Sequence, residues 1–285
     1  MLGSHLSVAG GMVNALLEAE RLKMETVQVF TKNQRQWSAK SLEPGVIRDW
    51  LTELHRLGWE DRTVSHASYL INMATSDPTN HAKSVNAMTD EVERCETLEI
   101  PFCVVHPGSH LGEGLENGIR RIVKAIDTVV KRTAGFRTLI LLETTVGSGN
   151  LIGGEFEHLA EIRKRVREPK RVATCLDTCH ISAAGYDIST GKKAAHVFRN
   201  FDRVVGLNNL RCFHLNDSKE PIASRRDRHE HIGDGYVGRG GFEFIMNEKK
   251  FSTRPMILET AKTVTAKGTP MDAVNLRRLR RMRGR

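Results

Sequence analysis

The sequence predicts an α/β protein built as a single (β/α)₈ barrel that takes up the whole chain, residues 1–285. Two observations favour this fold. Eight short apolar runs alternate with eight longer amphipathic ones, and no linker, low-complexity tract or shift in composition divides them. An open, doubly wound sheet is the alternative, and the count of eight strands favours the barrel.

The predicted strands are continuous apolar runs, which is typical of parallel strands buried on both faces. FCVVH and LILLE are the clearest of these runs. The strands are predicted at residues 2–8, 26–31, 62–66, 102–106, 138–143, 172–177, 210–215 and 255–259.

The segments between these strands repeat apolar residues near the 3.6-residue period of a helix. The helices are predicted at residues 12–22, 44–57, 79–98, 115–131, 155–166, 192–201, 241–247 and 270–281. In the basic C-terminal segment, residues 270–285, we expect Leu276, Leu279 and Met282 to face the barrel and the arginines to face solvent.

The composition is that of a globular protein with an excess of positive charge. Hydrophobic residues make up 39% of the chain and charged residues 27%, as in ordinary globular proteins. No apolar run reaches the length of a membrane span, and the first residues lack the pattern of a secretory signal. The five cysteines include no CxxC pair, which favours a reducing compartment, so we expect a cytoplasmic protein. The net charge of +9 favours a polyanionic partner such as nucleic acid, although basicity alone is a weak signal.

Acidic residues and histidines mark the ends of the predicted strands. In a (β/α)₈ barrel the functional groups lie at the C-terminal ends of the strands. One histidine at a strand end is usually a core or surface residue, but here six successive strands end on His, Asp or Glu. His180 lies just beyond the sixth strand, and the loop after the seventh strand adds two more such residues. The candidate metal ligands are His66, His106, Glu143, Asp177, His180, His214, Asp227, His229 and Glu259.

Nine ligands are too many for one ion, because a catalytic zinc takes about three protein ligands. Five imidazoles among them favour zinc over magnesium, with manganese as a possible substitute at one site. Closely spaced zinc ions generate hydroxide near neutral pH and polarise phosphoryl oxygens. The pattern therefore predicts two or three zinc ions and hydrolysis of a phosphodiester. His5, His110 and His231 lie nearby, and we expect them to hydrogen-bond the ligands or to lie at the surface.

Several segments in order carry a family resemblance: GSHLSVAGG at 3–11, HASYLIN at 66–72, HPGSH at 106–110, LDTCHISAAGYD at 176–187 and DRHEHIGDG at 227–235. Over nearly its whole length the chain resembles endonuclease IV, the zinc-dependent apurinic/apyrimidinic (AP) endonuclease family of DNA base-excision repair. The resemblance implies a barrel of the xylose-isomerase-like kind with a trinuclear zinc centre.

The resemblance also implies which ligands bind which of the three zinc ions. It implies one zinc on His66, His106 and Glu143. It implies a second on Glu143, Asp177, His214 and Glu259, and a third on His180, Asp227 and His229. Glu143 and Glu259 would be the catalytic carboxylates: Glu143 would bridge the first two ions, and Glu259 would orient or deprotonate the attacking water.

The implied reaction is cleavage 5′ to an abasic site in double-stranded DNA, leaving a 3′-hydroxyl and a 5′-deoxyribose phosphate, together with removal of blocked 3′ ends. The family bends DNA and flips the abasic sugar into its zinc pocket. Arg35, Tyr69 and Leu70 occupy the positions that enter the gap. Asp234, Tyr236 and the arginine-rich C-terminus depart from many relatives, which bears on DNA affinity.

Two other functions are open on the sequence. A divalent-metal sugar isomerase or epimerase could use the same barrel, although it needs fewer ligands and no excess of positive charge. A DNA-binding protein without catalytic activity would not require nine convergent ligands. We expect a monomer associated with the nucleoid.

Overall fold

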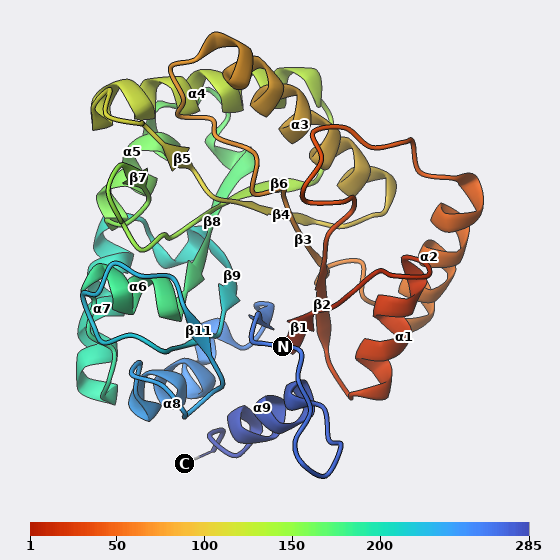
Figure 1. Cartoon of the computed structure of the whole chain (residues 1–285), viewed down its shortest axis with the longest axis vertical. Coiled ribbons are helices and arrows are strands. Elements are labelled where there is room, and N and C mark those ends of the chain that lie inside the picture. Colours follow the sequence, from red (N-terminus) through yellow and green to blue (C-terminus); the bar gives the residue numbers. More distant parts are fainter. Residues whose placement is uncertain (285) are drawn as a thin grey trace.

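Eight parallel strands close into a barrel in the computed structural model, which describes residues 1–284 (Figure 1). Each barrel strand pairs with those before and after it in the chain, and the first pairs with the last. The predicted barrel is therefore confirmed, and the open sheet is wrong. The strands are β1 (Leu2–His5), β2 (Thr26–Val29), β3 (Val64–His66), β4 (Phe102–Val105), β6 (Leu139–Glu143), β8 (Val172–Asp177), β9 (Leu210–His214) and β12 (Met256–Leu258).

Helices that follow the barrel strands surround the barrel (Figure 1). Proline begins two of them, Pro44 and Pro78, where its missing N–H costs no helical hydrogen bond. Gly58 ends the first of these with a φ of 63°, a left-handed conformation suited to glycine. The helices of the outer ring are α1 (Val13–Arg21), α2 (Pro44–Leu57), α3 (Pro78–Thr97), α4 (Leu115–Arg132), α5 (Phe156–Arg165), α7 (Gly191–Val204), α8 (Arg239–Asn247) and α9 (Met271–Arg280).

The apolar residues form two clusters. The larger one lies between the strands and the helices, and the smaller one lies inside the barrel. Six members of the inner cluster stand two positions before a candidate ligand on the same strand, so they point to the same side of the sheet. They are Val64, Val104, Leu141, Cys175, Cys212 and Ile257. The candidate ligands therefore form a polar layer on an apolar floor.

The structure contains short elements that periodicity did not predict. The helix α6 (Thr178–Ala184) begins directly after β8, where the Asp177 carboxylate accepts a hydrogen bond from the His180 N–H at 2.9 Å. Two antiparallel ladders pair β5 (Gly108–Ser109) with β7 (Leu151–Ile152) and β10 (Asp217–Ser218) with β11 (His229–Glu230). Elements of two to seven residues are too short to show a period. The first strand also ends at His5, three residues before its predicted end.

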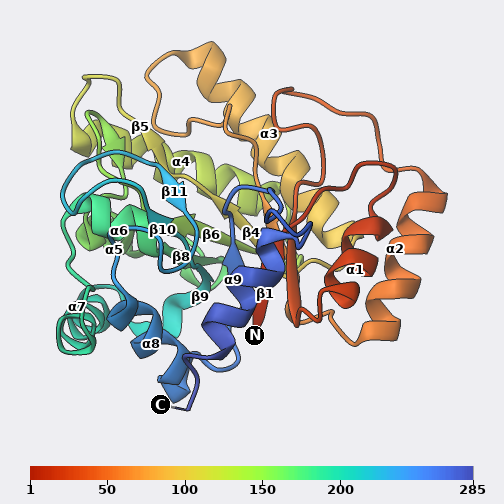
Figure 2. The ribbon, with the colours of Figure 1, turned by 60° about the horizontal axis from the view of Figure 1, so that its bottom comes forward.

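The C-terminal helix α9 packs beside β1 (Figure 2). The Ser4 hydroxyl donates to the Asp272 carboxylate at 2.9 Å across this contact. Leu276, Leu279 and Met282 are buried, which confirms the predicted inward face; the last residue of the predicted tail, 285, lies outside the described residues. In the part of the chain described, no helix has the length and apolar character needed to cross a membrane.

Candidate metal centre

All nine candidate ligands gather at the C-terminal mouth of the barrel. Six of them stand on the last residue of a barrel strand or on the residue after it: His66, His106, Glu143, Asp177, His214 and Glu259. His180 comes from the first turn of α6, and Asp227 and His229 come from the loop that β11 holds against β10. Strand ends and one ordered loop thus place every predicted residue at one site.

Glu143 lies at the middle of this site and is fully buried. Its Oε2 is 3.1 Å from His66 Nε2 and 3.2 Å from His106 Nε2. Its Oε1 is 3.0 Å from His214 Nδ1 and 3.2 Å from His180 Nδ1. Burial raises the pKa of Glu143, but His214 and His106 outweigh burial and hold this pKa well below its usual range. The carboxylate is therefore ionised and faces four imidazoles.

A second group surrounds the Nδ1 atom of His214. Glu259 Oε2 is 3.2 Å from it and Asp177 Oδ2 is 3.9 Å from it. With Glu143, these side chains form one set of donor atoms that lie within 4.8 Å of one another. Burial lowers the pKa of His214, but Glu259 and Glu143 raise it well above the usual value. Three carboxylates around one imidazole nitrogen make a strong site for a divalent cation.

A third group is held by α6 and β11. Asp227 Oδ2 is 3.2 Å from His180 Nε2, and Asp227 Oδ1 is 3.2 Å from His229 Nε2. Burial lowers the pKa of His229, yet Asp177 and Asp227 raise it to about 9. His229 Nε2 is buried and lacks a hydrogen-bond partner within residues 1–284. A buried nitrogen that lies 3.2 Å from a carboxylate oxygen without a hydrogen bond to it fits a metal ligand.

The spacing of the donor atoms fits zinc. Zinc binds nitrogen and oxygen at ~2.0–2.2 Å, so two donors on one tetrahedral ion lie ~3.3–3.6 Å apart. The histidine–carboxylate separations given above for these groups run from 3.0 Å to 3.9 Å, and all donor atoms within a group lie within 4.8 Å of one another. Three groups contain only the nine candidate ligands: His66, His106 and Glu143; Glu143, Asp177, His214 and Glu259; and His180, Asp227 and His229. Two further groups include cysteines: Cys175 and Cys212 with His214, and Cys179 with Asp177 and His229. The three groups without cysteine coincide with the ligand sets that the family resemblance implies.

Outer hydrogen bonds orient the imidazoles. His66 Nδ1 contacts the Ala67 carbonyl at 2.8 Å, and His180 Nδ1 contacts the Thr144 carbonyl at 2.8 Å. A proton on each Nδ1 would leave Nε2 free for a metal. This arrangement follows from the backbone of the strand ends.

Two buried amides that sequence reasoning missed hold the carboxylates. Gln28 Oε1 contacts His214 Nε2 at 2.8 Å, while Gln28 Nε2 donates to Glu259 Oε1 at 2.6 Å. Asn216 Nδ2 donates to Asp177 Oδ2 at 2.6 Å, and its Oδ1 accepts from the Glu259 N–H at 2.8 Å. The sequence feature that could indicate these amides is a polar residue within or directly after an apolar strand: Gln28 in TVQV and Asn216 in FHLN. His5 Nδ1 contacts the same Gln28 amide at 2.9 Å, which places His5 outside the three donor groups.

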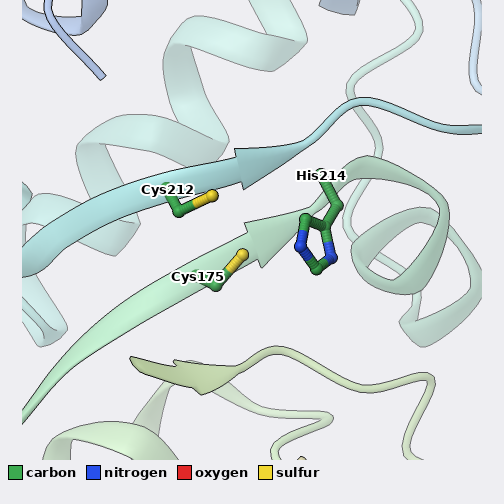
Figure 3. Close-up of side chains that lie close together, drawn as sticks. All are labelled: Cys175, Cys212 and His214. Atoms are coloured by element: carbon green, nitrogen blue, oxygen red, sulfur yellow. The ribbon is translucent and has the colours of Figure 1, made fainter. Parts of the chain in front are cut away.

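Two thiols lie near His214. Cys175 and Cys212 stand opposite each other on β8 and β9, and their thiols lie to one side of the imidazole (Figure 3). Burial and the neighbouring Cys212 raise the pKa of the Cys175 thiol well above its usual value. Both nitrogens of His214 already face other groups, the carboxylates on one side and Gln28 on the other. The thiols are therefore the floor of the centre, and all five cysteines are buried and free.

The predicted DNA-binding residues lie on two loops at the same mouth. Tyr69 is 62% exposed, and its ring centroid lies 5.4 Å from that of His66 and 6.1 Å from that of His106. Arg35 is exposed on the loop after β2, and Leu70 is half-buried. A cleft of about 790 Å³ beside the centre is lined by Tyr69 and Glu259, among others. The structure thus places Tyr69 next to the donor groups, and Arg35 and Leu70 on the loops at the same mouth.

Known proteins share this fold and sequence. The model of the Xylose isomerase-like TIM barrel family matches residues 16–280. The chain is 45% identical over 285 residues to the probable endonuclease 4 of Geobacter sulfurreducens, with 99% of this chain and 94% of the relative covered. It is 43% identical over 260 residues to the probable endonuclease 4 of Chloroflexus aurantiacus, with 91% of each covered.

Solved structures agree with these relatives. The crystal structure of endonuclease IV from Thermus thermophilus matches with a TM-score of 0.86 and 33% identity, covering 99% of this chain and 98% of that one. A D-tagatose 3-epimerase-like protein matches with a TM-score of 0.74 at 18% identity, covering 99% and 96%, which shows a common fold alone. By family model, full-length identity and structure, the chain belongs to the endonuclease IV family of xylose isomerase-like TIM barrels.

Proposed function

We propose that this protein is a DNA-repair AP endonuclease that hydrolyses the phosphodiester 5′ to an abasic site, leaving a 3′-hydroxyl and a 5′-deoxyribose phosphate. One observation carries the proposal: nine side chains at the barrel mouth form three donor groups, two of which share Glu143. The family membership and the net charge of +9 support a DNA substrate. We further propose that residues 1–285 act as one AP-endonuclease domain.

The three donor groups would hold three zinc ions, one to each group. Bound zinc supplies Lewis acidity toward the phosphoryl oxygens and lowers the pKa of water to about 7. Glu143 would be shared between the first two sites, since its Oε2 faces His66 and His106 and its Oε1 faces His214. Manganese is a possible substitute at one site.

Glu259 would orient the attacking water or accept its proton. The side chain is 12% exposed, so one edge of it reaches the cleft. Gln28 holds its Oε1 at 2.6 Å, which fixes the carboxylate while Oε2 stays near His214. A carboxylate fixed in this way can act without first being ordered.

The exposed loops would recognise the lesion. Tyr69 offers an aromatic face above the centre, Leu70 an apolar wedge, and Arg35 a cation for phosphate. Extrusion of an abasic sugar costs less unstacking energy than extrusion of a paired nucleotide, which favours damaged DNA. Blocked 3′ ends present a similar phosphodiester, so we also propose 3′-end cleaning. Because the proposed substrate is chromosomal DNA, we expect the protein to be cytoplasmic and associated with the nucleoid. We also expect it to be a monomer.

The test is incision of a duplex oligonucleotide that carries one abasic-site analogue, with an undamaged duplex beside it. We expect cutting immediately 5′ to the lesion, loss of cutting after chelation, recovery with zinc, and loss in His229→Ala. His196→Ala is the matched control, because His196 is exposed on α7. Metal analysis should give about three zinc ions per chain, as the three donor groups require. Tight metal binding without cutting of either duplex would overturn the proposal in favour of a sugar isomerase or epimerase.

A further inference from the structure

A cluster of four charged side chains, three of them buried, joins α3 to the loop after β2. It consists of Lys32, Asp90, Glu91 and Arg94, and none of these touches the donor groups. We propose that this α3 cluster is a positioning device that holds the loops bearing Arg35 and Tyr69 in the arrangement that engages DNA. The inference rests on the proposed function and deepens it.

The lysine of the cluster is anchored inside the protein. Its side chain is 1% exposed, and Lys32 Nζ lies 2.5 Å from Asp90 Oδ2 and 3.6 Å from Glu91 Oε1. Glu91 in turn accepts a hydrogen bond from the Thr31 hydroxyl at 2.7 Å. The start of the β2 loop is therefore attached to α3 by two successive side chains.

Arg94 attaches the same loop at a second point. Its guanidinium donates to the Thr31 carbonyl at 2.7 Å and 3.1 Å, and to the Lys40 carbonyl at 3.0 Å. Arg35 lies between these two attachment points. The loop is therefore closed across its base, while its tip stays exposed.

The second loop is tied to the first. The Ser68 hydroxyl donates to the Gln34 carbonyl at 2.7 Å, and it accepts from the Leu70 N–H at 3.2 Å. Tyr69 follows Ser68 directly, so the loop that bears Tyr69 is tied to the loop that the α3 cluster holds.

The four charged groups of the α3 cluster favour a positioning role over a purely stabilising one. Two cations and two carboxylates balance one another, yet taking them out of water costs free energy that apolar packing would avoid. Directional hydrogen bonds fix a loop geometry, which apolar contacts do not, and a pre-ordered loop loses less entropy when it binds. This saving in entropy matters more for exposed loops that bind a ligand than for the core, which is already ordered.

The test compares Glu91→Gln, which keeps the shape and removes the charge, with Glu93→Gln, an exposed carboxylate on the same helix. We expect KM for the abasic duplex to rise about 2- to 30-fold in Glu91→Gln. Hydrolysis of bis(4-nitrophenyl) phosphate, which is too small to reach the loops, and the zinc content should stay unchanged. If Glu91→Gln does not fold, Asp90→Asn, whose carboxylate is 36% exposed, replaces it.

Two further measurements separate positioning from general destabilisation. Hydrogen exchange should rise in residues 30–43 and 67–77 and not in the barrel strands. In an Arg35→Ala/Tyr69→Ala background, Glu91→Gln should raise KM no further, because it acts through those residues.

Additive effects, equal losses on both substrates, or unchanged exchange in the loops would overturn the inference. Failure of the wild-type protein to cut abasic DNA would instead reject the proposed function. Hydrogen exchange does not depend on the substrate, so it distinguishes the two failures.

Discussion

Replacing Gln28 with leucine removes an amide that contacts both His214 and Glu259. His214 Nε2 would lose its partner at 2.8 Å, and Glu259 Oε1 would lose a donor at 2.6 Å. His214 is fully buried, so water cannot take the place of the amide. An unsatisfied buried group costs about 1–3 kcal/mol.

Because Gln28 holds two ligands in place, we expect the same cost to weaken the free energy of zinc binding. A tenfold change in affinity corresponds to about 1.4 kcal/mol. Zinc affinity should therefore fall by about 5- to 150-fold, in line with the about 10- to 100-fold typical of outer hydrogen-bond partners. Competition with a chromophoric chelator measures this loss, and incision of abasic DNA should fall with it at limiting zinc. Gln36→Leu, on the exposed β2 loop, is the control for zinc affinity. Unchanged zinc affinity in Gln28→Leu would refute the reasoning.

Four other outcomes are expected. Glu143→Gln should lower the zinc content from three ions toward one, by metal analysis, because Glu143 belongs to two donor groups; retention of three ions would contradict its bridging role. Arg35→Ala should reduce the slope of log KM against log salt by about 1, whereas Arg120→Ala on the outer helix α4 should not. Ile126→Ala should cost about 2–4 kcal/mol in urea unfolding, since Ile126 is fully buried, and half-buried Val123→Ala should cost less. Burial lowers the pKa of His158, so the folded state binds fewer protons than the unfolded state; stability of the zinc-loaded protein should fall as pH drops below about 6.5, and His158→Asn should flatten that fall in thermal melts.

Much of the fold could be predicted from local pattern. Apolar runs such as LILLE sit where β6 does, and the period of 115–131 matches α4. Strand ends pointed to His66, Glu143 and His214 because parallel strands of a barrel all finish at one mouth. The short helix α6 was missed, since seven residues capped by Asp177 show too little periodicity.

Local pattern is therefore sufficient to predict the barrel, its outer helices and the residue types around its mouth, because each follows from periodicity or from position within one strand. Which of these groups meet depends on how the chain folds as a whole. Gln28 reaches His214 across 186 residues of chain, and Glu91 reaches Thr31 across 60. Barrel closure brings β2 near β9 and β12, and the packing of α3 against the loops sets the second contact. Local sequence carries no signal of such pairs, since their energy arises only when distant segments are already in place.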